Sequence, residues 1–503
     1  MDFLVLLLCL YLSWGLFQAL CFIANRGKPS RKGLPPGPRP LPIVGNLLQL
    51  GDRPDKLFTE LAKTYGPIMT MQLGRITTVV ISSAQVAREA LQTHDLAFSS
   101  RTILDAVTPY DHDRLSVAWL PVSPLWRSLR RIMSSHIFAT RKLDTTQQLR
   151  HQKVDEVLAL VRKRAHAGEP VEIGETGFRT SLNFLSNTFF SLDLANPGSD
   201  DGGKEFRDIV WNLMVEVGKP NLADYFPVLK LIDPNGRRRH LAVYFGQMLD
   251  IFDGLIKKRL QLRGKSADPT RTNDVLDSLL DINEDDNEGI SMDHIKFLLL
   301  DLFVAGTDTT STTLEWAMAE LLHNPDKLSR AKAELEQIIG RGNPVEESDI
   351  PQLPYLQAVI KETFRLHPTV PLLVPHKAEV ETEFCGFTVP KGVQVLINVW
   401  AIGRDTSSWE DPDAFMPERF LGPNSGIDVK GQNFELIPFG AGRRICPGLP
   451  LAMRMLHLML GSLVNCFDWK LENGMKPEDM NMEEALSITL RMVHPLRAVP
   501  VPL

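Results

Sequence analysis

Hydrophobic and polar residues recur with several different spacings along the chain, and each spacing predicts a different kind of element. Residues 3–23 contain no charged side chain, which predicts an apolar helix of about 31 Å, long enough to cross a bilayer core. Further on, apolar residues recur with the helical period. They predict long helices over Val154–Arg164, Leu241–Leu260, Asp293–Leu322 and Asp326–Ile339.

Shorter apolar stretches predict strands. Ile68–Leu73 and Thr77–Ser82 flank a short turn and predict one antiparallel pair. Gly386–Val389 and Gln394–Asn398 flank a proline–lysine–glycine turn and predict a second hairpin. Strands and helices do not alternate regularly, which argues against a doubly wound sheet. We therefore expect a mainly α fold with a small β region, built as a single catalytic domain over residues 43–503.

The residues after the apolar segment indicate how it sits in a membrane. Basic side chains follow it directly, at Arg26, Lys28, Arg31, Lys32 and Arg39. Because positive charge stays on the cytosolic side, we expect residues 3–23 to be a transmembrane anchor and the rest of the chain to face the cytosol. A cleaved secretory signal is the alternative, but its charge would precede a shorter apolar run. Residues 24–42 are basic and rich in proline, which predicts a stiff extended spacer.

Composition narrows the class of protein. Hydrophobic residues make up 44% and charged residues 23% of the 503 positions, which is typical of a globular protein and excludes disorder. The net charge of −6 gives no basic footprint for nucleic acid. Five cysteines without a CxxC spacing exclude a disulfide-rich scaffold and a zinc finger. Two acidic stretches, residues 281–288 and 342–349, predict exposed loops.

The sharpest motif surrounds Cys446. Residues 438–448 place glycines, prolines and two arginines around this one cysteine. Glycines allow the backbone to approach a flat ligand closely, and the neighbouring arginines and backbone N–H groups favour a thiolate over a thiol. A single thiolate on such a loop is suited to one coordination position of a metal. The alternative for an isolated cysteine is a small buried hydrophobic residue.

A second motif, residues 305–310, lies in the middle of the predicted helix Asp293–Leu322. Glycine within a helix costs about 1 kcal/mol relative to alanine, and threonine hydroxyls compete for backbone hydrogen bonds. A weak point in an otherwise good helix indicates function. Gly306 would leave room for a ligand on a metal, Thr309 would hold water and Asp308 would supply protons. A kinked core helix is the alternative.

Two residue pairs have helical spacing. Glu362 and Arg365 can pair on one helix face, although such a pair alone is usually exposed and worth about 0.3 kcal/mol. Trp126 and Arg130 are four residues apart and offer N–H donors without acceptors, which suits a carboxylate. A cation–π pair at the surface is the alternative for these two residues.

The loop around Cys446 resembles the haem-binding loop of the cytochrome P-450 superfamily, and the other motifs follow in that family's order along the whole chain. The resemblance implies the P-450 fold and a haem b cofactor, with Cys446 as the iron ligand. It implies that Asp308 and Thr309 activate dioxygen. Further haem contacts, including those to the propionates, are implied for Trp126, Arg130, His376, Phe439, Gly442 and Arg444. A buried structural network is implied for Glu362, Arg365 and Arg419.

Within this superfamily the chain resembles the plant microsomal branch. The likeness to this branch lies in the proline-rich spacer, Trp400–Asp405 and Pro438–Gly448. Phe178–Asn187 and Phe434–Pro438 are similar to the geraniol 8-hydroxylase group. That resemblance implies a single-pass protein of the endoplasmic reticulum membrane that hydroxylates a terpenoid such as the monoterpenol geraniol. The chain has no glycine-rich dinucleotide fingerprint, so electrons from NADPH would come through a partner, the NADPH–cytochrome P-450 reductase.

The segments expected over the haem are apolar, which favours a hydrophobic substrate and argues against a zwitterionic amino acid. They are Ile103, Leu104, Val107, Phe303, Val304, Ala305, Val370, Leu372, Leu373 and Ile488. Plain core packing is the alternative for these positions. Three alternatives to terpenoid hydroxylation stay open: oxidation of a diterpenoid or aromatic metabolite, a dioxygen-independent haem-thiolate isomerase or dehydratase, and a non-enzymatic haem binder.

Overall fold

The computed structural model describes residues 33–195, 203–265, 274–285 and 289–503, so the predicted anchor at residues 3–23 lies outside the described residues. The helices are α2 (Pro54–Tyr65), α3 (Ala84–Arg88), α4 (His112–Leu115), α5 (Pro124–Ile132), α6 (Thr140–Thr145), α7 (Gln147–Ala167), α8 (Ile173–Phe190), α9 (Gly203–Val217), α10 (Leu222–Tyr225), α11 (Arg237–Lys265), α12 (Val275–Glu284), α13 (Met292–His323), α14 (Pro325–Ile339), α15 (Pro354–Leu366), α16 (Val399–Ile402) and α17 (Leu449–Cys466). The strands are β1 (Ile68–Leu73), β2 (Ile76–Ile81), β3 (Ser100–Arg101), β4 (Val171–Glu172), β5 (His376–Lys377), β6 (Thr382–Phe384), β7 (Phe387–Val389), β8 (Gln394–Ile397), β9 (Phe467–Leu471), β10 (Glu484–Leu486), β11 (Leu490–Met492) and β12 (Arg497–Pro502).

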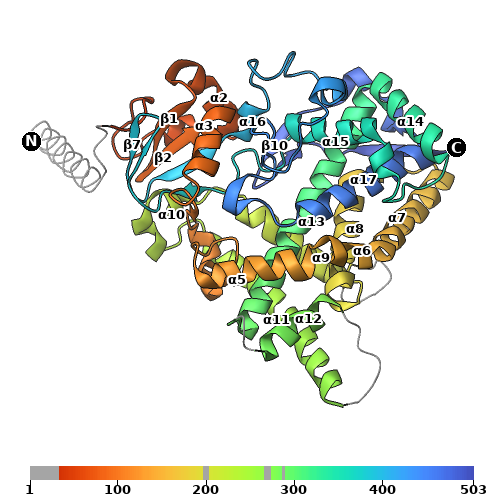
Figure 1. The fold of residues 1–503 in the computed structure, drawn as a ribbon, viewed down its shortest axis with the longest axis horizontal. Helices are drawn as coiled ribbons and strands as arrows, with labels where there is room; N and C mark the ends of the chain where they lie inside the picture. The colour runs from red at the N-terminus through yellow and green to blue at the C-terminus, as the bar shows by residue number, and fades with distance from the viewer. Residues whose placement is uncertain (1–32, 196–202, 266–273, 286–288) are drawn as a thin grey trace, which may run out of the picture.

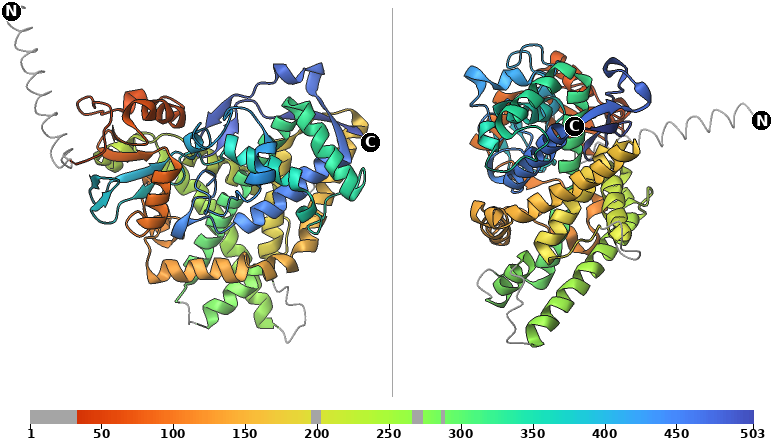
Figure 2. Two further views of the ribbon diagram at one scale, coloured as in Figure 1. Left: turned by 45° about the horizontal axis from the view of Figure 1, so that its top comes forward. Right: turned by 90° about the vertical axis from the view of Figure 1, so that its right-hand side faces the viewer.

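The molecule has a strand-rich end and a larger helical body (Figures 1 and 2). The main sheet has the order β1-β2-β8-β5-β3. Strands β1 and β2 pair antiparallel with Ile68 opposite Ile81, and β8 runs parallel to β2. The prediction of this first strand pair is therefore confirmed. The end of the spacer packs on the same sheet, because the backbone N–H of Thr70 donates to the carbonyl of Pro36 at 2.8 Å.

The second predicted hairpin is wrong in its pairing. Both strands exist, but β7 pairs with β6 and β8 pairs with β2 and β5. The tight turn lies instead between β6 and β7, where Cys385 and Gly386 have φ values of 51° and 79°. The apolar side chains of β8 fill the main sheet's core, with Val395 and Ile397 buried. The turn at residues 390–392 therefore carries the chain from one sheet to another.

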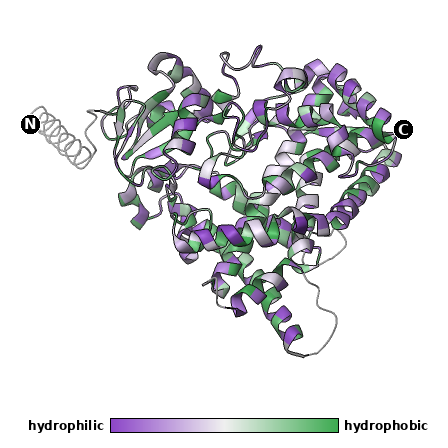
Figure 3. Cartoon of the chain, in the orientation of Figure 1, coloured by the Kyte–Doolittle hydropathy of each residue, from purple (hydrophilic) through white to green (hydrophobic). Residues whose placement is uncertain are grey.

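The helical body is built around α13, which packs against α8, α15 and α17. Hydrophobic residues gather on the strands and inner helices, and hydrophilic residues lie along the outer ones (Figure 3). Helices α7, α11, α13 and α14 confirm the four predicted by periodicity. The acidic stretch at residues 281–288 is not wholly a loop, because α12 continues to Glu284. Residues 342–349 do form a loop, although Val345 within it is buried.

Among the described residues one helix, α17, is long and apolar enough to cross a membrane. Because 72% of it is buried inside the protein, α17 is a core helix. It begins directly after the loop that contains Cys446, which places that loop at a helix N-terminus inside the body.

A buried ionic cluster joins α2, α13, α15 and β10. The ring of His367 stacks on Trp316 with centroids 3.8 Å apart, and its two nitrogens lie 2.7 Å from Glu320 and 2.9 Å from Glu484. Glu484 also pairs with Arg53 at 2.8 Å. Burial alone would raise the pKa of Glu484, but the hydrogen bond from His367 and the charges of His367, Arg404 and Arg53 lower it from 4.5 to about 2.

This cluster predicts an acid-sensitive contribution to stability. A carboxylate whose pKa is depressed on folding stabilises the fold above its unfolded pKa and loses that contribution as the pH falls toward 2. The shift corresponds to about 3 kcal/mol. We expect thermal unfolding of Glu484→Gln to begin at a lower temperature at pH 7 and to depend less on pH between 5 and 3 than that of the unsubstituted chain. Parallel pH dependences would show that Glu484 is not the titrating group.

Candidate active site

The loop before α17 presents the Cys446 sulfur to two backbone donors. The Cys446 N–H donates to the carbonyl of Phe439 at 2.9 Å, and its Sγ accepts from the N–H groups of Gly448 and Leu449. The side chain keeps exposed surface although it lies deep among protein atoms. Burial raises the pKa of the thiol, and the two N–H donors and Arg130 oppose that rise. A metal ion at this sulfur would bind the thiolate form.

The arginines beside Cys446 do not act on it as predicted. Arg443 is turned outward and pairs with Asp95 at 2.7 Å, and Arg444 donates to backbone carbonyls away from the sulfur. The cation that favours the thiolate is Arg130, which reaches the loop from α5 and donates to the carbonyl of Ile445 at 2.9 Å. Sequence neighbours were a poor guide here because consecutive side chains of an irregular loop point in different directions.

The glycines of the loop serve its packing on the protein. Gly442 has φ of 65°, and a Cβ there would lie 2.1 Å from the carbonyl oxygen of Leu91. Any other residue would therefore clash with backbone, and glycine is required. Phe439 packs edge-on against Phe364 of α15 with centroids 5.0 Å apart. The close approach that we predicted toward a flat ligand is, at Gly442, an approach to the neighbouring chain segment.

Three arginines gather beside this loop, of which Arg101 is buried and Arg130 and Arg444 are half-buried. Arg444 donates to the carbonyls of Ser99, at 2.8 Å, and Leu120, Arg130 donates to that of Ile445, and Arg101 donates to that of Val374 at 2.5 Å. Burial, with the charges of Arg444 and Arg130, lowers the pKa of Arg101 to about 9. Burial and Arg130 lower the pKa of Arg444 to about 10. Among the described residues no carboxylate pairs with any of the three.

Trp126 and His376 complete this cationic cluster. The indole ring lies under Arg444, 4.6 Å from the guanidinium carbon, and its N–H donates to the carbonyl of Val117 at 3.2 Å. His376 is buried, and its Nδ1 lies 2.7 Å from the carbonyl of Phe98. Burial and then the charges of Arg101 and Arg444 hold the pKa of His376 well below its ordinary value. A neutral ring that donates from Nδ1 has only an acceptor left at Nε2, so it would donate to a carboxylate only when protonated.

The residues of the cluster fit the haem that the cysteine loop implies. Buried cations without counter-ions are costly, and the Nε of Arg101 is buried without a hydrogen-bond partner. The two propionates of haem would supply the missing negative charge, and Cys446 would supply the iron ligand. Arg101 was not predicted from the sequence. No local pattern marks it, because its partners Arg130 and Arg444 come from distant parts of the chain.

Helix α13 runs unbroken through the motif at residues 305–310. Ala305 is exposed in the middle of this otherwise buried helix, and Thr309 is half-buried. The Thr309 hydroxyl donates to the carbonyl of Ala305 at 2.7 Å. These two residues therefore mark a face of α13 that protein does not cover. A Cβ at the half-exposed Gly306 would lie 3.0 Å from Leu185, so this glycine lets α8 approach, and its room for a metal's ligand stays a prediction.

Asp308 is held by the C-terminal hairpin. Its carboxylate pairs with Arg491 of β11 at 2.7 Å and accepts from the hydroxyl of Thr489 at 2.7 Å. Arg491 in turn lies 4.5 Å from the ring of Trp211 on α9. Arg491, a residue that the sequence did not single out, therefore holds the Asp308 carboxylate in place together with Thr489.

The network at Glu362 has the arrangement expected from the resemblance. Arg365 makes a bidentate contact to Glu362 at 2.7 and 2.8 Å, and Arg419 donates to the same carboxylate at 2.9 Å. Arg365 also donates to the carbonyls of Gly403 and Pro412. Glu362 and Arg365 are fully buried. The network therefore ties α15 to the long segment that leads to the cysteine loop.

The apolar positions predicted to contact substrate divide into two groups. Phe303 is fully buried in an aromatic cluster with Phe189, Phe190, Phe206 and Phe252, so its contacts are those of a core residue, and Val107 is buried as well. Ala305 is exposed. Partial exposure is retained by Ile103, Leu104, Val304, Val370, Leu372, Leu373 and Ile488. These eight residues keep surface that a ligand can contact.

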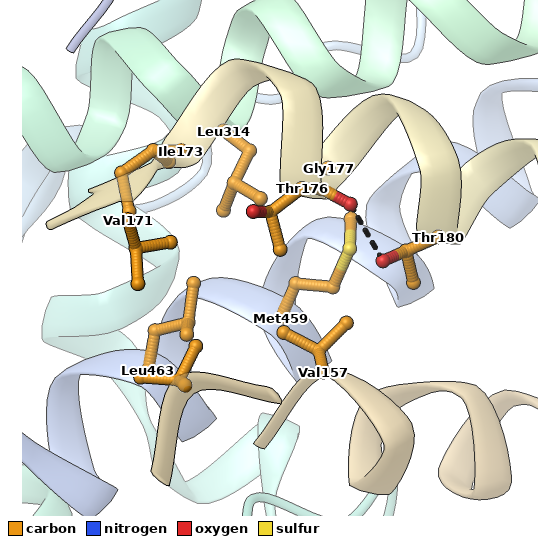
Figure 4. A pocket seen from close by; sticks show the side chains of 10 residues that line it. Val157, Val171, Ile173, Thr176, Gly177, Thr180, Leu314, Met459 and Leu463 are labelled. Atoms are coloured by element: carbon orange, nitrogen blue, oxygen red, sulfur yellow. Dashed lines mark hydrogen bonds between the residues drawn. The ribbon is translucent and has the colours of Figure 1, made fainter. Parts of the chain in front are cut away.

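A separate small cavity lies between α7, α8, α13 and α17 (Figure 4). Its lining is almost wholly apolar, as with Val157, Leu314 and Met459. It has room of about 10 Å³, no more than one water molecule needs. It is a packing defect and not a substrate site.

The comparisons with known proteins agree with this geometry. The cytochrome P450 family model matches residues 35–494. The chain is 54% identical to geraniol 8-hydroxylase of Catharanthus roseus over 99% of both chains, and 49% identical to drimenol monooxygenase of Persicaria hydropiper over 99% of this chain and 97% of that one. A solved zebrafish cytochrome P450 with progesterone superposes with a TM-score of 0.74 at 29% identity, covering 89% of this chain and 99% of that one.

The family match spans the cysteine loop, the cationic cluster and the central helix alike. The superposition on the solved structure covers 89% of this chain, so the two proteins share the fold that carries these residues. From these observations the chain belongs to the cytochrome P450 family and is a haem-dependent monooxygenase that acts with dioxygen and a redox partner.

Proposed function

We propose that this monooxygenase hydroxylates a terpenoid, with a monoterpenol such as geraniol as the first candidate. The 54% identity to geraniol 8-hydroxylase over nearly the whole chain carries the proposal. The predicted substrate-contact residues that keep exposed surface support it, because they are apolar and suit a hydrocarbon skeleton. A diterpenoid or an aromatic metabolite would meet the same wall and is the second candidate.

The chain's own residues have separable tasks in this reaction. When bound, haem supplies the activation of dioxygen, favoured by a thiolate ligand. Cys446 holds the iron, and Arg101, Arg130 and Arg444 hold the propionates. The Thr309 hydroxyl keeps water and protons near the place where dioxygen reacts, and Asp308 exchanges protons with it. The apolar wall excludes bulk water and holds the substrate's C–H bond close.

The substrate proposal is tested with microsomes that contain this chain, a reductase and NADPH. We expect geraniol to give a hydroxylated product that needs both NADPH and dioxygen. Product from a diterpenoid or a simple aromatic, and none from geraniol, would move the assignment to the second candidate. Conversion of any substrate without NADPH would indicate the isomerase or dehydratase chemistry.

Replacing Thr309 with alanine is expected to uncouple the reaction. The hydroxyl contacts only the Ala305 carbonyl of its own helix among the described residues, so its loss should leave folding and haem content unchanged. Proton delivery is worth about 10²–10⁴ in rate, and the neighbouring Thr310 and water should keep the loss near the lower end. The measurement is the ratio of product formed to NADPH consumed, with hydrogen peroxide as the balance. Thr310→Val is the matched control, because the Thr310 hydroxyl it removes likewise donates to a carbonyl of the same helix, that of Gly306. Equal ratios in all three proteins would contradict the role of Thr309.

We propose further that residues 3–23 anchor the protein in the endoplasmic reticulum membrane and that the reductase of that membrane is its electron donor. Deleting residues 1–23 is expected to release a folded, haem-binding protein. Val228, Leu231 and Ile232 expose 74%, 86% and 66% of their surface, so weak binding to the bilayer interface should remain. Flotation with liposomes measures both effects, and a truncated chain that loses haem would show that the segment belongs to the fold.

A further inference from the structure

A polar cluster lies between the central helix and α4. It consists of Asp301 on α13, His112 at the start of α4, and Ser116 directly after α4. The His112 Nε2 lies 3.0 Å from one carboxylate oxygen of Asp301. The Ser116 hydroxyl lies 2.8 and 2.7 Å from the two carboxylate oxygens. A charged group inside a hydrophobic region is costly to retain, so its presence requires an explanation.

The position of Asp301 on α13 connects it to the site. It precedes Ala305 by four residues, one helical turn or about 6 Å along the axis, and it precedes Thr309 by two turns. The three residues therefore share one helix face. Ala305 and Thr309 are the positions where that face is not covered by protein. Asp301 lies one turn before this uncovered stretch, where His112 and Ser116 cover most of its side chain.

The carboxylate has capacity for another donor. Two carboxylate oxygens accept about four hydrogen bonds, and the described residues supply donors from His112 and Ser116 alone. The side chains of Asp301 and His112 keep 9% and 7% of their surface, whereas Ser116 keeps none. The Nδ1 of His112 is buried without a partner. The cluster is thus held in place but not saturated.

The surroundings fix the cluster's geometry. The His112 ring stacks on Phe297 of α13 with centroids 5.4 Å apart and meets Phe245 of α11 edge-on at 4.8 Å. These contacts hold the imidazole against the carboxylate. Because the aromatic rings exclude water, a hydrogen bond made to Asp301 from the site side would be stronger than one made in solution.

We propose that the Asp301 carboxylate accepts a hydrogen bond from a hydroxyl group of the substrate and so selects terpenoid alcohols and orients them on α13. This inference rests on the proposed function and adds to it the substrate's functional group. Geraniol and drimenol, in the names of two relatives, are both alcohols. A hydroxyl at Asp301 leaves a skeleton of about 6–12 Å to run along Ala305 toward Thr309. The bond attacked is then one at the far end of the molecule from the hydroxyl.

A purely structural role is the rival explanation. In that role the cluster would only fasten α4 and the loop before it to α13. Such a role predicts that every ligand loses affinity alike when the cluster is weakened. Recognition of a hydroxyl predicts a loss confined to ligands that carry one, because an alcohol donates a hydrogen bond and its methyl ether does not.

The experiment compares geraniol with geranyl methyl ether as ligands of the full-length holoenzyme. Binding is followed by the shift of the haem absorption band, which needs no turnover. The unsubstituted chain should bind the alcohol about tenfold more tightly than the ether. Asp301→Asn keeps the shape and removes the charge, and it should abolish that preference by weakening the alcohol alone. Asp293→Asn is the matched control, because Asp293 lies on the same helix with 66% of its side chain exposed.

Ser116→Ala gives a second readout if Asp301→Asn binds no haem. Removing one donor that positions the carboxylate should reduce the preference for the alcohol by a smaller factor, about threefold. Equal affinity of the unsubstituted chain for alcohol and ether would overturn the inference and leave the proposed function standing. Equal losses for both ligands in the variants would also overturn it, in favour of the structural role. Failure of both ligands to bind the unsubstituted chain would overturn the inference and the monoterpenol proposal together.

Discussion

Replacing Cys446 with serine is expected to abolish both the thiolate spectrum and the monooxygenase activity. The loop offers its sulfur two N–H donors, from Gly448 and Leu449, and the nearby charge of Arg130. Each of these stabilises an anion at this position. A serine hydroxyl is far harder to ionise than a thiol and does not supply the electron-donating sulfur on which the chemistry of this haem depends. The expected product formation is therefore at background.

The measurement is the absorption band of the reduced protein under carbon monoxide, together with haem content and product formation. Cys466→Ser is the matched control. Cys466 is a buried cysteine at the end of α17, where its sulfur donates to the carbonyl of Gly342 at 3.3 Å. The control should keep the red-shifted band and the activity. A normal band in Cys446→Ser and a lost band in Cys466→Ser would reverse the assignment.

The elements with a long repeating pattern were predictable from the sequence, and the contacts between distant segments were not. Periodicity identified α7, α11 and α14 because each buries one face over several turns, and the long apolar pattern identified α13, which is buried all round over residues 310–322. The pairing of β8 was missed because it depends on β2, more than 300 residues earlier. A local turn signal cannot show which strand lies on the other side.

The distance along the chain between interacting residues also explains which residues of the candidate site were predicted. Cys446 and the Glu362–Arg365 pair were found because their chemistry lies within a few residues. Arg101 and Arg491 were missed because their function comes from residues that folding brings to them. The glycine at position 306 did not show which segment comes close to it, and in the fold that segment includes Leu185 of α8.

Replacing Glu362 with glutamine is expected to destabilise the protein by about 3–5 kcal/mol, because it leaves two buried guanidinium groups without a counter-ion. Glutamine keeps the shape of the side chain and one acceptor oxygen. It removes the negative charge that Arg365 and Arg419 share at 2.7–2.9 Å. The backbone N–H of Met416 also donates to this carboxylate, at 2.7 Å, so the segment before the cysteine loop should loosen as well.

The expected result is a low yield of haem-bound protein and a lower temperature of haem release, with little change in the rate per haem of the molecules that do fold. That separation distinguishes a structural residue from a catalytic one, because within the described ranges the Glu362 carboxylate contacts only arginines and a backbone N–H. Glu336→Gln, at an exposed position of α14, is the matched control and should behave as the unsubstituted chain does. A stable Glu362→Gln protein with impaired turnover per haem would contradict the structural role, since it would mean that the carboxylate acts in the reaction and not in holding α15 to the segment that positions Cys446.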